Sequence, residues 1–221
     1  MRRYTVAIVL ILILFAAGYG IGNLIGGRGT HDVGTPSPAG GARVQPPRQV
    51  SDFTLTSDTG EPVSLSDFRG EAVLFFFGYT HCPDVCPNTL ANFTRVKEAL
   101  GETADDVTFA FISVDGERDS PDVIADYLAQ FDSEFVGMTG SAEQLREIGR
   151  EYSLQVGRET INVDHEHTEG DEHDLDEENY FVQHTSPAFL LDPEGYLRRL
   201  YFYGTGPDII AAGIREMLSR S

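Results

Sequence analysis

A continuous apolar run places the strongest constraint on the fold of this chain. It reads Ala-Val-Leu-Phe-Phe-Phe at residues 72–77 and ends at Gly78. No polar residue interrupts it, so neither face of the element suits contact with water. A strand of this kind belongs inside a sheet that is covered on both faces. We therefore expect an α/β domain with its central strand at 72–77.

Strand and helix patterns alternate along the chain on both sides of this run. Further strands are predicted at 53–56, 62–65, 107–114, 188–191 and 197–203. Amphipathic helices are predicted at 88–100, 121–131, 142–152 and 207–219. The alternation predicts an α/β three-layer domain.

The N-terminal segment has the pattern of a membrane anchor. Residues 4–25 carry no charge and are long enough to cross a bilayer as a helix. Arg2 and Arg3 precede this span and the next basic residue is Arg28, so the N-terminus is expected in the cytoplasm. Residues 1–26 are thus predicted to be a transmembrane helix in the cytoplasmic (inner) membrane. A cleaved signal peptide is the alternative, and both place the domain on the extracytoplasmic, periplasmic side.

Two further regions follow the predicted anchor. Residues 27–49 are rich in Gly, Pro, Ser and Thr, which predicts a linker without packed elements. Residues 50–221 are long enough to bury a core of their own and form the predicted domain.

The formal net charge of the chain is −19. Nucleic acid is excluded as a partner, because contacts with phosphates require clustered Lys and Arg. The charge suits cationic partners, including metals, and it is also compatible with nothing more than a strongly solvated surface.

The only cysteines of the chain, Cys82 and Cys86, follow the apolar run and precede a predicted helix. A helix N-terminus favours thiolate over thiol, so a cysteine there is expected to have a lowered pKa. Thiolates bind soft metals and attack disulfides, so both chemistries remain open. Dithiol oxidoreductases commonly have two residues between their cysteines, whereas three intervene here, which favours copper(I). A structural disulfide is the third possibility.

Three ordered motifs resemble the Sco/SenC family of copper-binding cytochrome c oxidase assembly proteins. They are Gly-Tyr-Thr-His-Cys-Pro-Asp-Val-Cys-Pro at 78–87, Phe-Ile-Ser-Val-Asp-Gly-Glu-Arg-Asp-Ser-Pro at 111–121, and His-Thr-Ser-Pro-Ala-Phe-Leu-Leu-Asp-Pro-Glu-Gly at 184–195. The resemblance implies a thioredoxin-like fold that binds copper, as Cu(I) and possibly Cu(II), through Cys82, Cys86 and His184. Only the third motif assigns His184 to this site.

The resemblance also implies a function. A chain of this family is expected to act as a copper metallochaperone for the dinuclear copper centre of cytochrome c oxidase. Its partners would be the copper-centre subunit or other copper chaperones, and metal transfer of this kind needs no enzymatic turnover. The alternative is a thiol-disulfide oxidoreductase that reduces the cysteines of the target protein. A peroxidase-like activity is a third hypothesis, because peroxiredoxins share the fold.

A histidine-rich acidic segment lies just before the third motif. His165, His167 and His173 stand among carboxylates in residues 164–178. Such a segment either binds divalent metal weakly, as an accessory site, or is a solvated loop. Asp115 is expected near the cysteines without being a ligand, because carboxylates bind copper(I) poorly. His81 is likewise expected beside the pair and outside the metal's ligand set.

Overall fold

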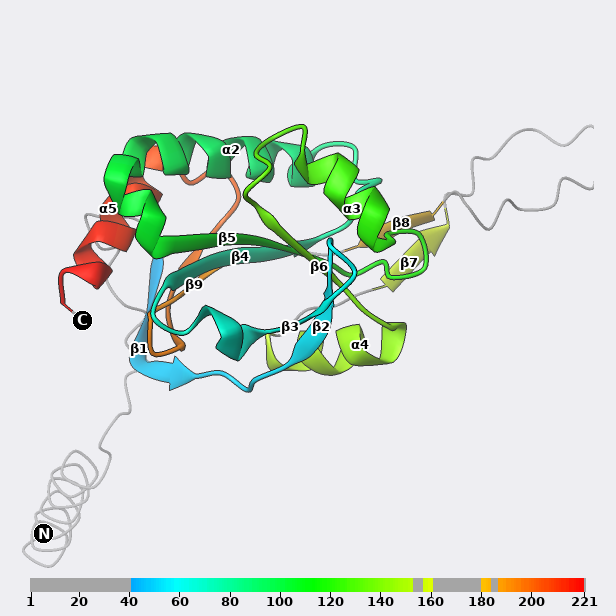
Figure 1. Ribbon diagram of the computed structural model, residues 1–221, viewed down its shortest axis with the longest axis horizontal. Helices are drawn as coiled ribbons and strands as arrows, with labels where there is room; N and C mark the ends of the chain where they lie inside the picture. The colour runs from blue at the N-terminus through cyan, green and yellow to red at the C-terminus, as the bar shows by residue number, and fades with distance from the viewer. Residues whose placement is uncertain (1–40, 153–156, 161–179, 184–186, 221) are drawn as a thin grey trace, which may run out of the picture. The chain divides into compact units, whose positions relative to one another are not determined.

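The computed structural model describes residues 41–152, 157–160, 180–183 and 187–220 (Figure 1). The predicted anchor at residues 1–26 lies outside this part of the chain. No helix among the described residues combines the length and the apolar character that crossing a bilayer requires.

An eight-stranded mixed sheet forms the centre of the domain. Its strand order is β1-β10-β9-β4-β5-β6-β2-β3, and β4, β5 and β6 run parallel to one another. The strands are β1 (Ala42–Gln49), β2 (Thr54–Ser57), β3 (Pro62–Ser64), β4 (Ala72–Gly78), β5 (Val107–Ser113), β6 (Val136–Thr139), β9 (Ala188–Leu191) and β10 (Tyr196–Tyr201). A separate two-stranded sheet joins β7 (Gly157–Thr160) to β8 (Tyr180–Gln183).

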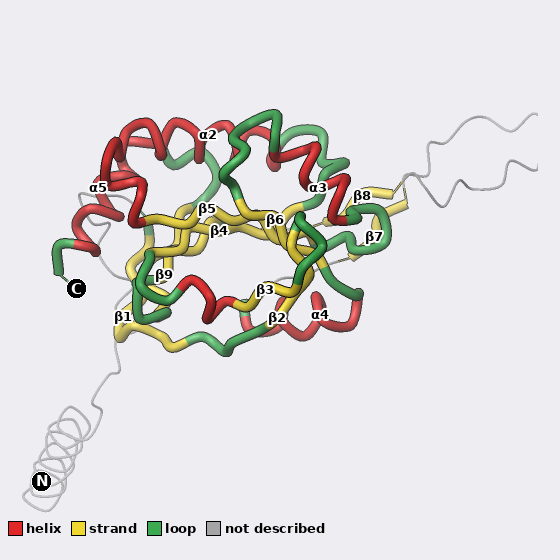
Figure 2. The backbone as a smooth tube through the Cα atoms, viewed as in Figure 1, coloured by secondary structure: helices red, strands yellow, loops and turns green. Residues whose placement is uncertain are grey.

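Helices cover both faces of the large sheet (Figures 1 and 2). One face carries α2 and α3, with α5 packed beside α2, and the other face carries α4. The α-helices are α2 (Val85–Leu100), α3 (Pro121–Leu128), α4 (Ala142–Glu151) and α5 (Pro207–Leu218), and two 3-10 helices are η1 (Leu65–Phe68) and η2 (Gly101–Asp106). The predicted three-layer α/β architecture is confirmed for the described residues.

The predicted central strand is confirmed as β4, in which every residue is buried. Side chains alternate between the two faces of a strand, so the run of phenylalanines fills both layers of the core. Phe75 stacks on Phe189 with ring centroids 5.2 Å apart and meets Tyr152 edge-on at 5.5 Å. On the opposite face, Phe76 meets Phe93 of α2 at 5.5 Å. The aromatic contacts thereby fix β4, and the segment that follows it, relative to both helical layers.

The predicted linker at 27–49 is wrong in its last part. Residues 42–49 form β1, which pairs antiparallel with β10 at the edge of the sheet. Proline lacks a backbone donor, but an edge strand tolerates it where the register shifts, and the register of β1 shifts between Arg43 and Arg48, on either side of Pro46 and Pro47. The folded part of the chain therefore begins before residue 50.

Two other differences from the sequence predictions concern the surroundings of the motifs. Helix α2 begins at Val85, three residues before the predicted start, so Cys86 lies inside the helix. The small β7–β8 sheet was not predicted, because its four-residue strands flank the polar segment 164–178 and carry little periodic signal.

The contact between α5 and β10 gives a test of the packing. Gly213 lies in α5, where alanine would ordinarily favour the helix by about 1 kcal/mol. A Cβ atom at residue 213 would, however, lie 2.1 Å from the hydroxyl oxygen of buried Tyr201. We expect Gly213→Ala to lower the free energy of unfolding by roughly 1–3 kcal/mol, measured by urea denaturation of the full-length protein in detergent.

Tyr201→Phe provides the matched control for this overpacking. The Tyr201 hydroxyl is buried and has no hydrogen-bond partner among the described residues, so its removal is expected to cost little. The double variant Tyr201→Phe, Gly213→Ala should regain most of the stability that Gly213→Ala loses. Equal stability of the single and double variants would show that the hydroxyl is not the obstacle.

Candidate functional site

The cysteine pair lies where the central strand meets the first long helix. β4 ends at Gly78, a short loop follows, and α2 begins at Val85. Cys82 is in the loop and partly exposed, whereas Cys86 is in the first turn of α2 and fully buried. The two side chains are thiols rather than a disulfide.

The sulfur of Cys82 helps to complete the start of α2. The first backbone N–H groups of a helix lack partners within the helix, and a side chain at the N-cap commonly accepts from one of them. The N-cap residue Asp84 makes no such bond. The backbone N–H of Cys86 donates instead to Sγ of Cys82, at 3.4 Å between nitrogen and sulfur. The Cys82 sulfur therefore lies at the positive end of the helix, where negative charge is stabilised.

Cys86 differs sharply from Cys82. The hydrogen bond with the Cys82 side chain, followed by burial, raises the pKa of the Cys86 thiol far above its usual range. The lowered pKa that the sequence predicts for a cysteine at a helix N-terminus is therefore wrong for Cys86, because the hydrogen bond and burial both favour its thiol over its thiolate. A Cβ atom at Gly78 would lie 2.8 Å from the Cys86 sulfur, so only glycine ends β4 without displacing that sulfur.

A buried carboxylate, Asp119, holds the cysteine loop against the end of β5. Its side chain is 0% exposed. One oxygen accepts from the backbone N–H of Thr80 at 2.9 Å and from the hydroxyl of Ser113 at 2.5 Å. The other accepts from the hydroxyl of Thr80 at 2.6 Å. Three donors thus satisfy a charge that would otherwise be costly to bury.

Asp119 is a site residue that sequence reasoning missed. It lies in the second motif, but a single aspartate in a loop does not reveal that it bonds to a segment 39 residues earlier. One signal was available in the sequence. Thr80 and Asp119 belong to motifs that follow two predicted strands, and if those strands are parallel neighbours, as β4 and β5 are, their carboxyl ends lie at the same edge of the sheet.

Asp115 reaches the cysteine loop through an arginine. It is buried, and its carboxylate accepts from Nε of Arg118 at 2.5 Å. The Arg118 guanidinium lies over the ring of Tyr79 at 5.9 Å from the centroid, and Tyr79 follows β4 directly. Asp115 therefore lies close to the loop, as predicted, and helps to position it.

His81 is exposed beside the loop. Its Nδ1 lies 3.0 Å from the hydroxyl oxygen of Thr80 and 3.7 Å from a carboxylate oxygen of Asp119. Nδ1 of the His81 ring therefore interacts with the polar groups that hold the loop.

The remaining predicted ligands lie outside the described residues. These are His184 and the three histidines of the acidic segment, His165, His167 and His173. Within the described ranges, no group of three or more His, Cys, Asp or Glu side chains is arranged to hold a metal ion. The described part of the chain thus contains the two predicted sulfur ligands, and the assignment of both cysteines and of the histidines to a metal stays a prediction.

The unequal burial of the cysteines predicts unequal reactivity. Iodoacetamide should modify Cys82 of the reduced, metal-free protein at least about tenfold faster than Cys86, because only Cys82 is accessible and Cys86 stays protonated at neutral pH. Mass spectrometry of peptides from timed samples measures both rates, and the difference should vanish in urea. Equal rates in the folded protein would contradict the described burial.

The Asp119 network predicts a large effect of a small substitution. Asp119→Asn replaces one acceptor oxygen with a donor that faces donors, so we expect a loss of about 2–3 kcal/mol in the free energy of unfolding. Asp126→Asn, at an exposed position in α3, is the control and should change stability by less than about 0.5 kcal/mol. Similar denaturation midpoints for the two variants would show that the buried bonds contribute little.

Comparison with known proteins agrees with this arrangement. A family model described as SCO1/SenC matches residues 42–219. A SCO2-like protein of Rickettsia prowazekii is 31% identical over 166 residues, which cover 75% of this chain and 73% of the relative. The structure of Bradyrhizobium japonicum ScoI with copper bound has 30% identity and a TM-score of 0.64, over 76% of this chain and 98% of that one.

A further solved structure, BsSco, has 25% identity and a TM-score of 0.60, over 80% of this chain and 96% of its own. BsSco is described as a member of the Sco family of cytochrome c oxidase assembly proteins in which a disulfide switch was identified. The family model covers most of the chain, including β4, the loop with Cys82 and the helix α2 with Cys86. The chain belongs to the SCO1/SenC family and has its thioredoxin-like α/β fold.

Proposed function

We propose that this protein binds Cu(I) through Cys82, Cys86 and His184 and delivers it to the dinuclear copper centre of cytochrome c oxidase during assembly. The observation that carries the proposal is the pair of thiols at the junction of β4 and α2, one of them capping the helix. The copper bound to the related ScoI protein supports the choice of metal.

The sheet register supports His184 as the third ligand. β9 runs antiparallel to β4, with Phe189 opposite Phe75. The amino end of β9 therefore lies beside the carboxyl end of β4, from which the cysteine loop departs. His184 precedes the first residue of β9 by four positions, a stretch that spans at most about 14 Å. This register is compatible with the assignment of His184 as the third ligand.

The ligand chemistry favours copper over zinc. Two thiolates and one imidazole form a soft, three-coordinate set, which suits Cu(I). Structural zinc sites are almost always four-coordinate. A three-coordinate ion can also accept a ligand from a partner before it loses one of its own, which permits transfer by ligand exchange. The partial exposure of Cys82 gives a partner's thiolate one accessible side from which to approach.

The location of this activity follows from the N-terminal sequence. We propose that residues 1–26 anchor the protein in the cytoplasmic membrane and that residues 27–41 connect the anchor to β1. The domain would then face the extracytoplasmic side. The copper-centre subunit of cytochrome c oxidase, or another copper chaperone, would meet the protein there.

The alternative function is thiol-disulfide exchange. Cys82 and Cys86 lie close enough for a backbone hydrogen bond from one to the sulfur of the other, and BsSco is described as having a disulfide switch. In this reaction the dithiol would become a disulfide while two electrons and two protons pass to a partner disulfide. The accessible Cys82 would attack first and the buried Cys86 would resolve the mixed disulfide.

A single substitution separates the two functions. His184→Ala removes one copper ligand and neither sulfur, so the affinity for Cu(I) should fall at least about tenfold, measured by competition with a chromogenic Cu(I) chelator. The rate at which the reduced protein reduces a model disulfide should change less than about twofold. The reverse pattern would favour the oxidoreductase.

His81→Ala is the matched control. It removes an exposed imidazole that adjoins Cys82 in sequence, and it should leave the affinity for Cu(I) within about twofold of the unmodified protein. A loss in His81→Ala equal to that in His184→Ala would show that His184 has been wrongly assigned as the third ligand.

A further inference from the structure

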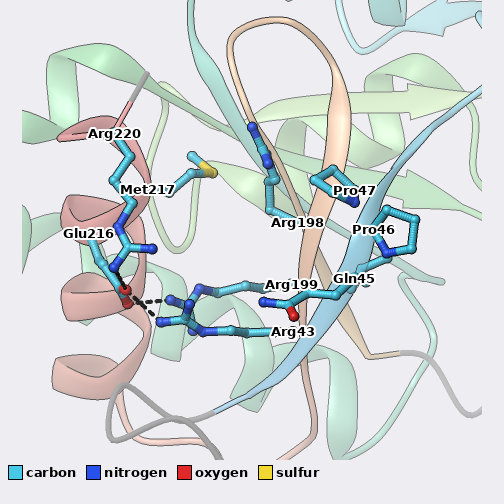
Figure 3. A pocket seen from close by; sticks show the side chains of 10 residues that line it. Arg43, Gln45, Pro46, Pro47, Arg198, Arg199, Glu216, Met217 and Arg220 are labelled. Atoms are coloured by element: carbon cyan, nitrogen blue, oxygen red, sulfur yellow. Dashed lines mark hydrogen bonds and ion pairs between the residues drawn. The ribbon is translucent and has the colours of Figure 1, made fainter. Parts of the chain in front are cut away.

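A cavity lined by arginines lies away from the cysteine pair, between β1, β10 and α5 (Figure 3). Its volume is about 590 Å³. In the sheet register, Arg199 lies opposite Leu190, and Leu190 lies opposite Leu74 near the start of β4. The cysteines follow the other end of β4, so the cavity is separate from the candidate copper site.

The lining of this cavity is exceptional for so acidic a chain. Of the 16 Lys and Arg residues in a protein with 35 Asp and Glu, four line this one cavity. They are Arg43, Arg198, Arg199 and Arg220. Of the described residues that line the cavity, Glu216 alone is acidic.

Glu216 draws three of the arginines together. Its carboxylate accepts from Arg43 at 2.5 Å, from Arg220 at 2.9 Å and from Arg199. Arg199 is almost completely buried, which is uncommon for an arginine that is not in a specific cluster. Figure 3 shows the three guanidinium groups converging on Glu216 from β1, β10 and the end of α5.

One carboxylate does not balance the charge of this lining. The fourth arginine, Arg198, pairs with Asp192 outside the cavity. Among the lining side chains that the structure describes, three guanidinium groups around one carboxylate sum to a net positive charge. Arginine presents its donors in a planar fork that matches phosphate oxygens, and a concave cationic surface concentrates anions.

The other walls of the cavity indicate what else the ligand carries. Figure 3 shows Pro46 and Pro47 of β1 on the opposite side of the space from Met217 of α5, and Val44 and Gln45 of β1 also line it. These walls are largely apolar, with Gln45 as their polar side chain, and the cavity is several times larger than a phosphate ion. A ligand that fills it needs an organic group next to its anionic end.

We propose that this cavity binds a phosphate group carried by an organic molecule. Two sources share this chemistry: a soluble phosphomonoester and the headgroup of a phospholipid. The second source would be near, because the stretch 27–41 between the predicted anchor and β1 extends at most about 50 Å.

Three probes distinguish the sources when added to the full-length protein in a phosphate-free maltoside detergent. They are inorganic phosphate, glycerol 3-phosphate and dihexanoylphosphatidic acid below its micellar concentration, with dihexanoylphosphatidylcholine as the zwitterionic control. Isothermal titration calorimetry should show saturable binding of at least one organic phosphate, tighter than inorganic phosphate. A preference for phosphatidic acid over glycerol 3-phosphate assigns a lipid headgroup, and the reverse assigns a soluble ester. No saturable binding of any phosphate probe would overturn the proposal.

Charge substitutions test whether binding occurs in this cavity. Arg220→Gln removes an exposed guanidinium from the lining and should weaken binding about tenfold. Arg215→Gln removes the same charge from α5, five residues before Arg220, but Arg215 bonds to the backbone of Ala99 and does not line the cavity, so binding should be unchanged. Glu216→Gln removes the competing carboxylate and should strengthen binding. Equal affinities in the Arg220→Gln and Arg215→Gln proteins would overturn the assignment.

A chemical footprint on the unmodified protein makes the test independent of variant stability. The bound phosphate ester should slow the modification of Arg43 and Arg220 by phenylglyoxal and leave the rate at Arg215 unaltered, as read by peptide mass spectrometry. Equal protection at all three positions, or none, would contradict the proposal.

Discussion

The burial of β4 on both faces is the constraint on which the rest of the structure depends. Its phenylalanines pack alternately against α2 and against the opposite layer, so the strand has no freedom to slide without exposing a face. The position of its last residue, Gly78, is therefore fixed. The loop with Cys82 and the helix turn with Cys86 begin at a fixed point, and this converts two flexible thiols into a defined pair.

The hydrogen bonds of Asp119 then set the path of the loop. Backbone and side-chain bonds from Thr80 hold the chain immediately after β4, and the bond from Ser113 ties the same carboxylate to β5. A buried charge with three donors is strongly oriented, because any displacement leaves one donor unsatisfied. The loop thus gains rigidity from a buried carboxylate that is hydrogen-bonded to the loop and to β5. A rigid loop limits the number of positions that the two sulfurs can take relative to each other.

The sequence predicts this centre of the fold well because its signals are local. A run of apolar residues, a turn and the spacing of apolar residues on one helix face can each be recognised within about a dozen positions. These patterns predict β4, α2, β5 and α5. Two features depended on distant contacts and could not be predicted in this way. β1 looks like a linker because Pro46 and Pro47 break the strand pattern, and only pairing with β10 makes it a strand. Asp119 gains its role from Thr80, which is remote in sequence.

The different surroundings of Cys82 and Cys86 bear on both proposed functions. A high pKa disfavours the free thiolate of Cys86, so the pair does not hold two negative charges side by side in the metal-free protein. A soft cation supplies the charge that makes the second thiolate favourable, and release of the cation restores the proton. In thiol exchange the same asymmetry makes Cys82 the attacking group. The same arrangement is therefore compatible with both proposed functions, copper binding and thiol-disulfide exchange, and they differ in whether they need an imidazole at the two sulfurs. That distinction lies in residue 184 rather than in the cysteines.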